Sequence, residues 1–258
     1  VIALHPSFSN SLSFHDTATS ASWDAVADSA GVLVVYPNGT SKASWNGTGT
    51  PPITYPDDTT LAWNSFSYTD ASGMSVSGPG VDDIGFLTAV IDDMAASYQV
   101  DRDRVYVTGF SNGAMMANTF SIARSDLVAA CGPVSGGWVD AYAGTSAAAR
   151  LWPKHPVPTW IWRGSAEDSL PQTGSYDLDN GGAGDGTAGT SRAVQDPNQR
   201  AWWISRNQTI GTPMLSTTTV QSGSQTRTLN HERYTGGWRG VEVRYTTVVG
   251  TSHQWQPG

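Results

Sequence analysis

The chain has 258 residues, with 14 Lys and Arg against 22 Asp and Glu, and its single cysteine is Cys131. This length suits one large α/β domain or two small ones. A single cysteine excludes an internal disulfide and a cysteine-based zinc site. The formal net charge of −8 and the lack of a basic cluster argue against a nucleic-acid partner. No apolar run approaches the roughly 20 residues that a membrane helix needs.

Charged residues make up only 14% of the chain, well below the roughly 25% of an average soluble domain. Only two residues are lysines and three are glutamates, so Ser, Thr, Gly and Asn cover the surface. This composition predicts an exported protein, which we expect to be a monomer. Both ends look trimmed, because the chain opens in the apolar run 1–4 and stops at residues 257–258 without a closing element. The absence of a leader therefore says nothing about location.

Short apolar strands alternate with helical patterns, and residues 1–258 show no internal repeat or linker. Continuous Val, Ile and Leu strands indicate a mostly parallel sheet with helices on both faces, in a single α/β domain. Strands are expected at 1–4, 32–36, 105–108, 127–134, 157–162 and 241–249, with a hairpin at 214–220 and 225–234. Helices are expected at 23–30, 84–98, 112–124 and 199–206, and loops at 38–80 and 171–192.

Residues 109–113 form a G-x-S-x-G motif centred on Ser111. The motif follows the strand 105–108 and opens a helix, which is the context of a nucleophile elbow. Its two glycines avoid Cβ collisions in a strained turn. The helix N-terminus behind Ser111 favours negative charge on a tetrahedral intermediate. We therefore predict that Ser111 is a catalytic nucleophile.

A serine nucleophile needs a base and an acid that orients it, in the chain order Ser, acid, His. His253 follows the last expected strand, 241–249, and is the predicted base, whereas His231 is interpreted as an exposed strand histidine. The acid should follow the strand 157–162, where Glu167 and Asp168 are adjacent. The residues leave the choice between these two carboxylates open.

The oxyanion hole should use the backbone N–H of Asn112, the residue after the nucleophile. A second N–H should come from the loop after the first strand. Pro6 has no N–H, so this donor is Ser7 or Phe8.

Five stretches are similar to one esterase group, namely residues 3–5, 27–37, 81–87, 101–116 and 253–258. The chain resembles the polyhydroxybutyrate depolymerase and feruloyl esterase group of α/β-hydrolases, related to carbohydrate esterase family 1. The resemblance implies an α/β-hydrolase fold and a secreted serine carboxylesterase that forms an acyl-enzyme and needs no cofactor.

The chain departs from the family pattern at three places. Pro6 stands where the family usually has Gly, and Arg163 replaces the usual His before Gly164. The Asp of the family's Gly-x-x-Asp pattern falls, by spacing, on Glu167 rather than on Asp168, which is the alternative acid.

The resemblance implies polyhydroxyalkanoate-type polyesters, or feruloyl and acetyl esters of plant polysaccharide, as substrates. Trp255, Trp63 and His5 are the expected substrate contacts, and Trp45 is a further candidate for the wall of the site. Residues 177–181 faintly resemble a calcium loop but lack its ligands, so we predict no metal. The alternatives are a catalytically inactive hydrolase fold and a carbohydrate-binding protein that uses exposed tryptophans.

Overall fold

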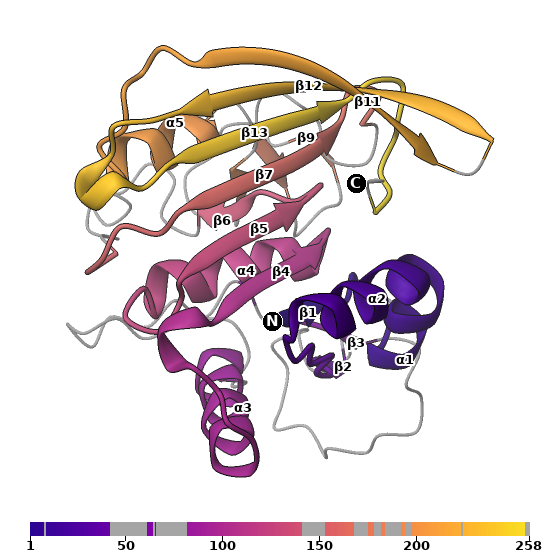
Figure 1. The fold of residues 1–258 in the computed structure, drawn as a ribbon, viewed down its shortest axis with the longest axis vertical. Helices are drawn as coiled ribbons and strands as arrows, with labels where there is room; N and C mark the ends of the chain where they lie inside the picture. Colours follow the sequence, from indigo (N-terminus) through magenta and orange to yellow (C-terminus); the bar gives the residue numbers. More distant parts are fainter. Residues whose placement is uncertain are drawn as a thin grey trace.

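A seven-stranded sheet forms the centre of the computed structural model (Figure 1). The structure describes residues 1–7, 9–41, 61–63, 65, 82–140, 153–167, 175–177, 182–183, 192–194, 198–222 and 224–255. The helices are α1 Ser11–Ser13, a π-helix Phe14–Thr19, α2 Ser20–Ala30, α3 Asp83–Ser97, α4 Asn112–Ala123 and α5 Asn198–Arg206. The strands are β1 Ile2–Leu4, β2 Thr40–Ser41, β3 Leu61–Ala62, β4 Tyr106–Phe110, β5 Ala130–Val134, β6 Trp138–Asp140, β7 Thr159–Gly164, β8 Ser175–Asp177, β9 Gly182–Ala183, β10 Arg192–Val194, β11 Met214–Ser222, β12 Gln225–Tyr234 and β13 Val243–Val248.

The order of the central sheet is β1-β4-β5-β7-β13-β12-β11. The first five of these strands pair in parallel, and β12 and β11 add an antiparallel hairpin at one side. Leu4 of β1 lies opposite Gly109 of β4, and Val248 of β13 lies opposite Gly164 of β7. Because parallel strands end at the same edge of a sheet, the loops after β1, β4, β7 and β13 emerge together. Those loops carry the residues that the sequence singles out for catalysis.

Helix α4 packs against β1, β4 and β5, and α5 packs against β13. Nearly every residue of α4 is buried, which agrees with its small and apolar composition. Met116 and Phe120 of α4 join Val107 and Ile161 of the sheet in one apolar core. Fully burying a side chain of this size stabilises the fold by about 1.5–3 kcal/mol, so the core holds the start of α4 firmly behind the sheet edge.

Two helix ends agree with the sequence prediction. Helix α2 ends at Ala30, and Gly31 follows with φ of +63°, which glycine adopts without strain. Asp82 caps α3, because its Oδ1 accepts a hydrogen bond from the Gly85 N–H at 2.8 Å.

Three expected elements differ from the structure. Residues 32–36 are not a full strand, because the run pairs with β1 only around Val35 while Leu33 is exposed. The expected strand 127–134 starts only at Ala130, after a turn. The expected loop 171–192 contains β8 and β9 and the start of β10, which pair with one another and with β6. The pairings of β10 with β6 and β8 join residues distant in sequence, and local composition does not encode them. Most of the loop 38–80 lies outside the described residues, apart from β2, β3 and a few neighbours.

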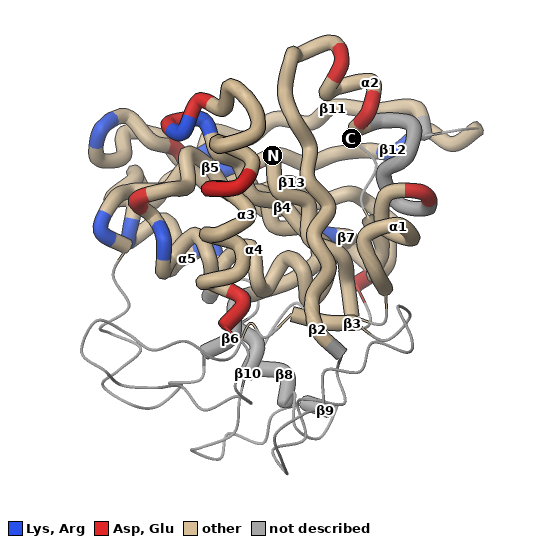
Figure 2. Tube along the Cα trace, turned by 90° about the horizontal axis from the view of Figure 1, so that it is seen from below, with Lys and Arg blue, Asp and Glu red and all other residues tan. Residues whose placement is uncertain are grey.

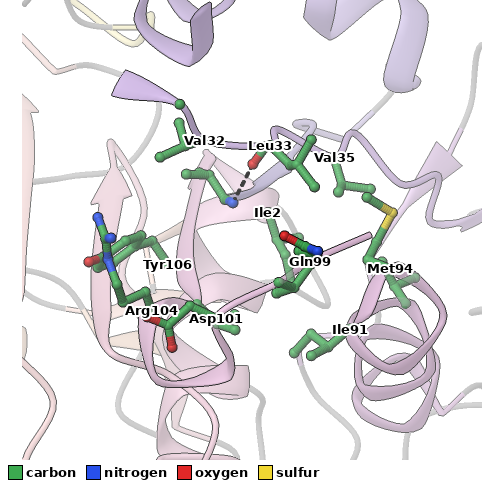
Figure 3. A pocket seen from close by; sticks show the side chains of 15 residues that line it. Ile2, Val32, Leu33, Val35, Ile91, Met94, Gln99, Asp101, Arg104 and Tyr106 are labelled. Atoms are coloured by element: carbon green, nitrogen blue, oxygen red, sulfur yellow. Dashed lines mark hydrogen bonds between the residues drawn. The ribbon is translucent and has the colours of Figure 1, made fainter. Parts of the chain in front are cut away.

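A cavity of about 230 Å³ lies at the opposite edge of the sheet from the loops described above (Figure 3). It is lined at the start of β1 by Val1 and Ile2, at the start of β4 by Tyr106, and on α3 by Met94. The Val1 ammonium group donates a hydrogen bond to the Leu33 carbonyl at 2.7 Å beside it. Since β4 begins at Tyr106 and ends at Phe110, this cavity is separated from Ser111 by the length of the strand.

Charged residues are sparse, and Figure 2 shows the Lys and Arg segments interspersed with Asp and Glu segments. None of the helices in the described part of the chain is both long enough and apolar enough to span a membrane.

Candidate active site

Ser111 lies on a sharp turn between the end of β4 and the start of α4. Its backbone has φ of 54° and ψ of −117°, a conformation that non-glycine residues rarely adopt and that costs about 1–3 kcal/mol. The glycines on either side make the turn sterically possible. A Cβ on Gly109 would lie 2.5 Å from the Gly113 carbonyl oxygen, and a Cβ on Gly113 would lie 2.1 Å from the Leu4 carbonyl oxygen. The G-x-S-x-G motif therefore forms the strained turn that the sequence predicts.

His253 bridges Ser111 and Glu167. The His253 Nε2 atom lies 2.9 Å from the Ser111 Oγ, and its Nδ1 atom lies 2.8 Å from the Glu167 Oε1. The Glu167 side chain is 0% exposed, and His253 is its ion-pair partner in the described part of the chain. Phe110 packs against the imidazole at a ring-centroid distance of 4.8 Å. A buried carboxylate is stable only when it is paired, so this contact explains how Glu167 is tolerated there.

The loops that carry Glu167 and His253 are fastened to each other. The Ala166 N–H donates to the Thr251 carbonyl at 2.9 Å, and the Gly250 N–H donates to the Ser165 Oγ at 2.8 Å. A Cβ on Gly164 would lie 2.2 Å from the Thr251 carbonyl oxygen. The parallel pairing of β7 and β13 brings the two loops together, and the glycine lets them touch. Asp168, the alternative acid, lies outside the described residues.

Asn112 is the first residue of α4, so its backbone N–H has no acceptor within the helix. Ser7, in the loop after β1, is half-buried, and its N–H has no acceptor among the described residues. Both groups fit the sequence prediction for oxyanion donors. Phe8, the other candidate, lies outside the described residues.

His5 is 0% exposed, and both of its ring nitrogens are hydrogen-bonded. The Gly39 N–H donates to Nε2 at 3.0 Å, so Nε2 is an acceptor and the proton of the neutral ring is on Nδ1. Nδ1 then donates to the Pro6 carbonyl at 2.8 Å. Burial lowers the pKa of His5 to about 4, in agreement with a neutral ring. The expectation that His5 contacts substrate is corrected, because the ring is enclosed by the chain.

Trp63 is also 0% exposed, which corrects its expected role as a substrate contact. Its indole Nε1–H donates to the His5 carbonyl at 3.0 Å, and the two rings lie 5.1 Å apart. The indole is part of the apolar core, so it supports the loop after β1 from behind. Trp255 is half-buried two residues after His253 and packs edge-on against Phe14 at 5.4 Å. Trp45 lies outside the described residues.

His231, the second histidine downstream of Ser111, lies on β12. Its ring nitrogens contact the hydroxyl groups of Thr218 at 2.7 Å and Thr246 at 2.9 Å. Cys131 is buried in the core, and burial raises the pKa of its thiol to about 12, so it is not a reactive nucleophile. Within the described residues, no group of three His, Cys, Asp or Glu side chains is arranged to hold a metal ion.

Sequence reasoning missed the side chain of Asn112. Its Oδ1 accepts from the Trp63 N–H at 2.6 Å, and its Nδ2 donates to the Trp63 carbonyl at 3.1 Å. The motif drew attention only to the backbone N–H of Asn112. Nothing in the local pattern points to a partner 49 residues away.

No protein-family model matches the chain. A solved structure, the acetyl xylan esterase from Aspergillus awamori, superposes with a TM-score of 0.56 and 16% sequence identity, over 98% of this chain and 82% of that one. Together with the parallel sheet and the strained turn, this likeness identifies the α/β-hydrolase fold.

Three curated relatives then define the group to which the chain is similar. It is 29% identical over 151 residues to NocK of Nocardia uniformis subsp. tsuyamanensis, a protein named as an esterase, covering 58% of this chain and 36% of NocK. It is 30% identical over 149 residues to the bifunctional acetylxylan esterase/xylanase XynS20E of Neocallimastix patriciarum, covering 57% of this chain and 16% of XynS20E. It is 40% identical over 48 residues to poly(3-hydroxyalkanoate) depolymerase C of Paucimonas lemoignei, covering 19% of this chain and 12% of the depolymerase. The resemblance to esterases of the polyhydroxyalkanoate depolymerase group is confirmed, and the chain spans 36% or less of the length of each relative.

Proposed function

We propose that the chain is a serine carboxylesterase. The observation that carries this proposal is the continuous contact from the buried Glu167 carboxylate, through both nitrogens of His253, to the Ser111 hydroxyl. A nucleophile, a base and an orienting acid in mutual contact are the requirement for acyl transfer through a serine. The esterase names of the relatives support the same reaction class.

In the proposed reaction, the Ser111 Oγ attacks the ester carbonyl carbon while its proton moves to the His253 Nε2. The tetrahedral intermediate collapses when the carbon–oxygen bond to the alcohol breaks, and His253 returns the proton to that alcohol. A water molecule then gives its proton to His253 and attacks the acyl-enzyme. The acid leaves, and Ser111 regains its proton.

In this scheme the Glu167 carboxylate pairs with the Nδ1 atom of His253. That pairing favours the tautomer with its proton on Nδ1, whose Nε2 faces Ser111, and the carboxylate stabilises the imidazolium that forms during attack. The 2.8 Å contact and the complete burial of the carboxylate support this role for Glu167 over Asp168.

The proposed oxyanion donors are the backbone N–H groups of Asn112 and Ser7. The Pro6 carbonyl is held by the Nδ1–H of His5. In a trans peptide the carbonyl and the following N–H point in opposite directions, so this bond turns the Ser7 N–H away from His5. The start of α4 adds a favourable dipole for the developing negative charge.

For substrates, we propose hydroxyacid polyesters, or acetyl and feruloyl esters of plant polysaccharide. The names of the depolymerase and acetylxylan esterase relatives support these classes. We further propose that the protein is exported, which its low lysine and glutamate content supports. Trp255, close in sequence to His253 and half-buried, is the proposed aromatic contact for substrate.

The test is hydrolysis of p-nitrophenyl acetate and butyrate by the wild-type chain and by Ser111→Ala. We expect activity only in the wild type, with the same thermal unfolding midpoint in both proteins. A serine-reactive phosphonate should label Ser111 alone. Labelling of a different serine, or an active Ser111→Ala variant, would overturn the proposal. A panel of polyhydroxybutyrate, methyl ferulate and acetylated xylan then separates the substrate classes.

A further inference from the structure

The side-chain amide of Asn112 uses both its oxygen and its nitrogen to bind the main chain of one residue, Trp63. A backbone N–H can only donate and a carbonyl can only accept, so the two bonds fix the amide with Oδ1 toward the Trp63 N–H and Nδ2 toward the Trp63 carbonyl. Asn112 is 5% exposed and Trp63 is 0% exposed. Losing either bond would leave a buried polar group without a partner, which is costly.

The segment bound by Asn112 is also fastened to α4 at a second point. Asn112 Nδ2 lies 3.5 Å from the Ser65 Oγ, and the Thr119 hydroxyl donates to the Ser65 carbonyl at 3.2 Å. Trp63 and Ser65 therefore lie alongside α4, the helix that begins at the residue after the nucleophile.

Trp63 passes this constraint on to the loop after β1. Its indole N–H donates to the His5 carbonyl at 3.0 Å, immediately before the Pro6–Ser7 peptide. Three segments of the chain thus meet at the site, the turn at Ser111, the segment at Trp63 and the loop at Ser7. Side-chain bonds of Asn112 and Trp63 link the turn at Ser111 to the segment at Trp63 and to the loop at Ser7.

We propose that the Asn112 side chain is a positioning residue for oxyanion stabilisation, because it holds, through Trp63, the loop that carries the Ser7 N–H. This inference rests on the proposed esterase function and adds a second role to Asn112. The backbone N–H of Asn112 is one proposed oxyanion donor, and the side chain of Asn112 sets the distance to the other donor, the Ser7 N–H. Oxyanion donors act through preorganised geometry, so a displaced Ser7 N–H should weaken binding of the transition state while leaving binding of the ester largely unchanged.

The chain contains a matched control in Asn207. Its Oδ1 accepts from the Val157 N–H at 3.0 Å, its Nδ2 donates to the Val157 carbonyl at 2.7 Å, and it is 0% exposed. Residue type, bonding pattern and burial therefore match those of Asn112. Asn207 follows α5 and holds the segment before β7, at the start of that strand and hence at the edge of the sheet opposite Ser111.

The experiment compares the wild type with Asn112→Ala, Asn207→Ala and Trp63→Phe. For each protein we would measure the thermal unfolding midpoint, kcat and KM on p-nitrophenyl butyrate, and the inhibition constant of a trifluoromethyl ketone. The Ser111 Oγ adds to the ketone carbon, its proton passes to His253, and the ketone oxygen becomes an oxyanion. Alanine keeps the backbone N–H of residue 112, so the direct donor is retained.

Removing an oxyanion donor outright costs about 10²–10³ in kcat, so a displaced donor in Asn112→Ala should cost about 10–100-fold. The affinity for the ketone should fall by the same factor, and KM should change by less than about threefold. Asn207→Ala should lower the unfolding midpoint to a similar degree but keep kcat within about threefold. Trp63→Phe removes the indole bond, at the cost of a small cavity in the core, and leaves the two Asn112 bonds to the main chain in place. It should reduce kcat by about 3–10-fold, which keeps the proposal testable if Asn112→Ala does not fold.

Equal losses of kcat in Asn112→Ala and Asn207→Ala would overturn the inference, since they would indicate general destabilisation. So would an unchanged ketone affinity in both Asn112→Ala and Trp63→Phe. Failure of the proposed function looks different, because the wild type would then hydrolyse no ester or Ser111→Ala would remain active.

Discussion

The two halves of the proposed active site are built in different ways. The proposed proton-transfer half consists of side chains in direct contact, with His253 between Ser111 and Glu167. The proposed oxyanion half consists of backbone N–H groups beside buried side chains that bind the main chain, chiefly those of His5 and Asn112. The first half depends on a few atoms at side-chain ends, and the second depends on how several chain segments pack.

This difference determines what a substitution does in each half. A change at the end of a side chain in the proton-transfer half removes a chemical group and leaves the backbone in place. A change in the oxyanion half leaves buried polar groups unsatisfied or forces segments apart, so it alters stability and activity together. The predictions below test this contrast, starting with the largest expected effect.

Apart from loss of Ser111 or His253, the largest effect is expected at Glu167, in the proton-transfer half. Glu167→Gln replaces the buried carboxylate with an amide, which no longer selects the productive His253 tautomer or stabilises the imidazolium. We expect kcat to fall by about 10³–10⁴, without a large fall in the unfolding midpoint. Steady-state kinetics and thermal unfolding of the variant measure both quantities.

Asp168→Asn is the matched control for Glu167→Gln, and it should lower kcat by less than about tenfold. A reversed order, with Asp168→Asn nearly inactive and Glu167→Gln active, would assign the acid to Asp168 and leave the reaction class unchanged.

In the oxyanion half, Gly113→Ala should reduce stability and activity together. Its new Cβ would lie 2.1 Å from the Leu4 carbonyl oxygen and 2.6 Å from that of His5, so backbone must move. We expect a loss of about 1–3 kcal/mol in the free energy of unfolding, measured by urea denaturation, and a parallel loss of kcat. Gly211→Ala is the control, because a Cβ there meets nothing within 4 Å. A stable Gly113→Ala variant would show that this half is less tightly packed than the structure indicates.

The sequence predicts that Ser111, His253 and a carboxylate after β7 lie together, and the structure brings Ser111, His253 and Glu167 into contact for a physical reason. Ser111 lies in a strand–turn–helix whose glycines are required by local sterics, and that local requirement is visible in the motif. The place of His253 after the last strand follows from parallel strands ending at one edge. Once the order of strands is recognised, the acid and the base are restricted to two short loops.

The oxyanion half is predicted less completely, because its supports lie far apart in sequence. His5 and Trp63 were expected to contact substrate, since a histidine and a tryptophan near a cleft suit that role. The structure buries both, and their partners are Gly39 and Asn112. Burial of this kind depends on tertiary packing, which neither periodicity nor motif spacing specifies.

A smaller effect, on acid stability, is expected from His5 in the oxyanion half. Burial lowers its folded-state pKa to about 4, below the ordinary value of 6.5. Between these values the unfolded chain binds one more proton than the folded chain, so stability falls as the pH drops from about 6.5 to about 4. At about 1.4 kcal/mol per pH unit, the loss attributable to His5 approaches 3 kcal/mol. Protonation of Nε2 would also remove the acceptor of the Gly39 N–H.

Urea denaturation of the wild type and His5→Gln between pH 7 and pH 4.5 checks this. The variant is expected to be less stable at pH 7 but to lose stability less steeply toward acid. Carboxylate titrations affect both proteins alike, so the difference between the two slopes reports His5. Parallel slopes would contradict a buried, neutral His5.

The smallest effect is expected from His231→Ala, which tests whether the proton-transfer half uses one histidine. Activity of the wild type should rise with pH, because the base must be neutral to accept the Ser111 proton. His231 bonds the hydroxyls of Thr218 and Thr246 within the sheet, and in the described part of the chain no hydrogen bond or ion pair joins it to Ser111 or Glu167. Its removal should therefore leave the midpoint of the pH profile of kcat/KM unchanged, and cost only about 1 kcal/mol of stability. His253→Ala, measured beside it, should be inactive at every pH. An inactive His231→Ala beside an active His253→Ala would exchange the roles of the two histidines, and with them the division of the site into its two halves.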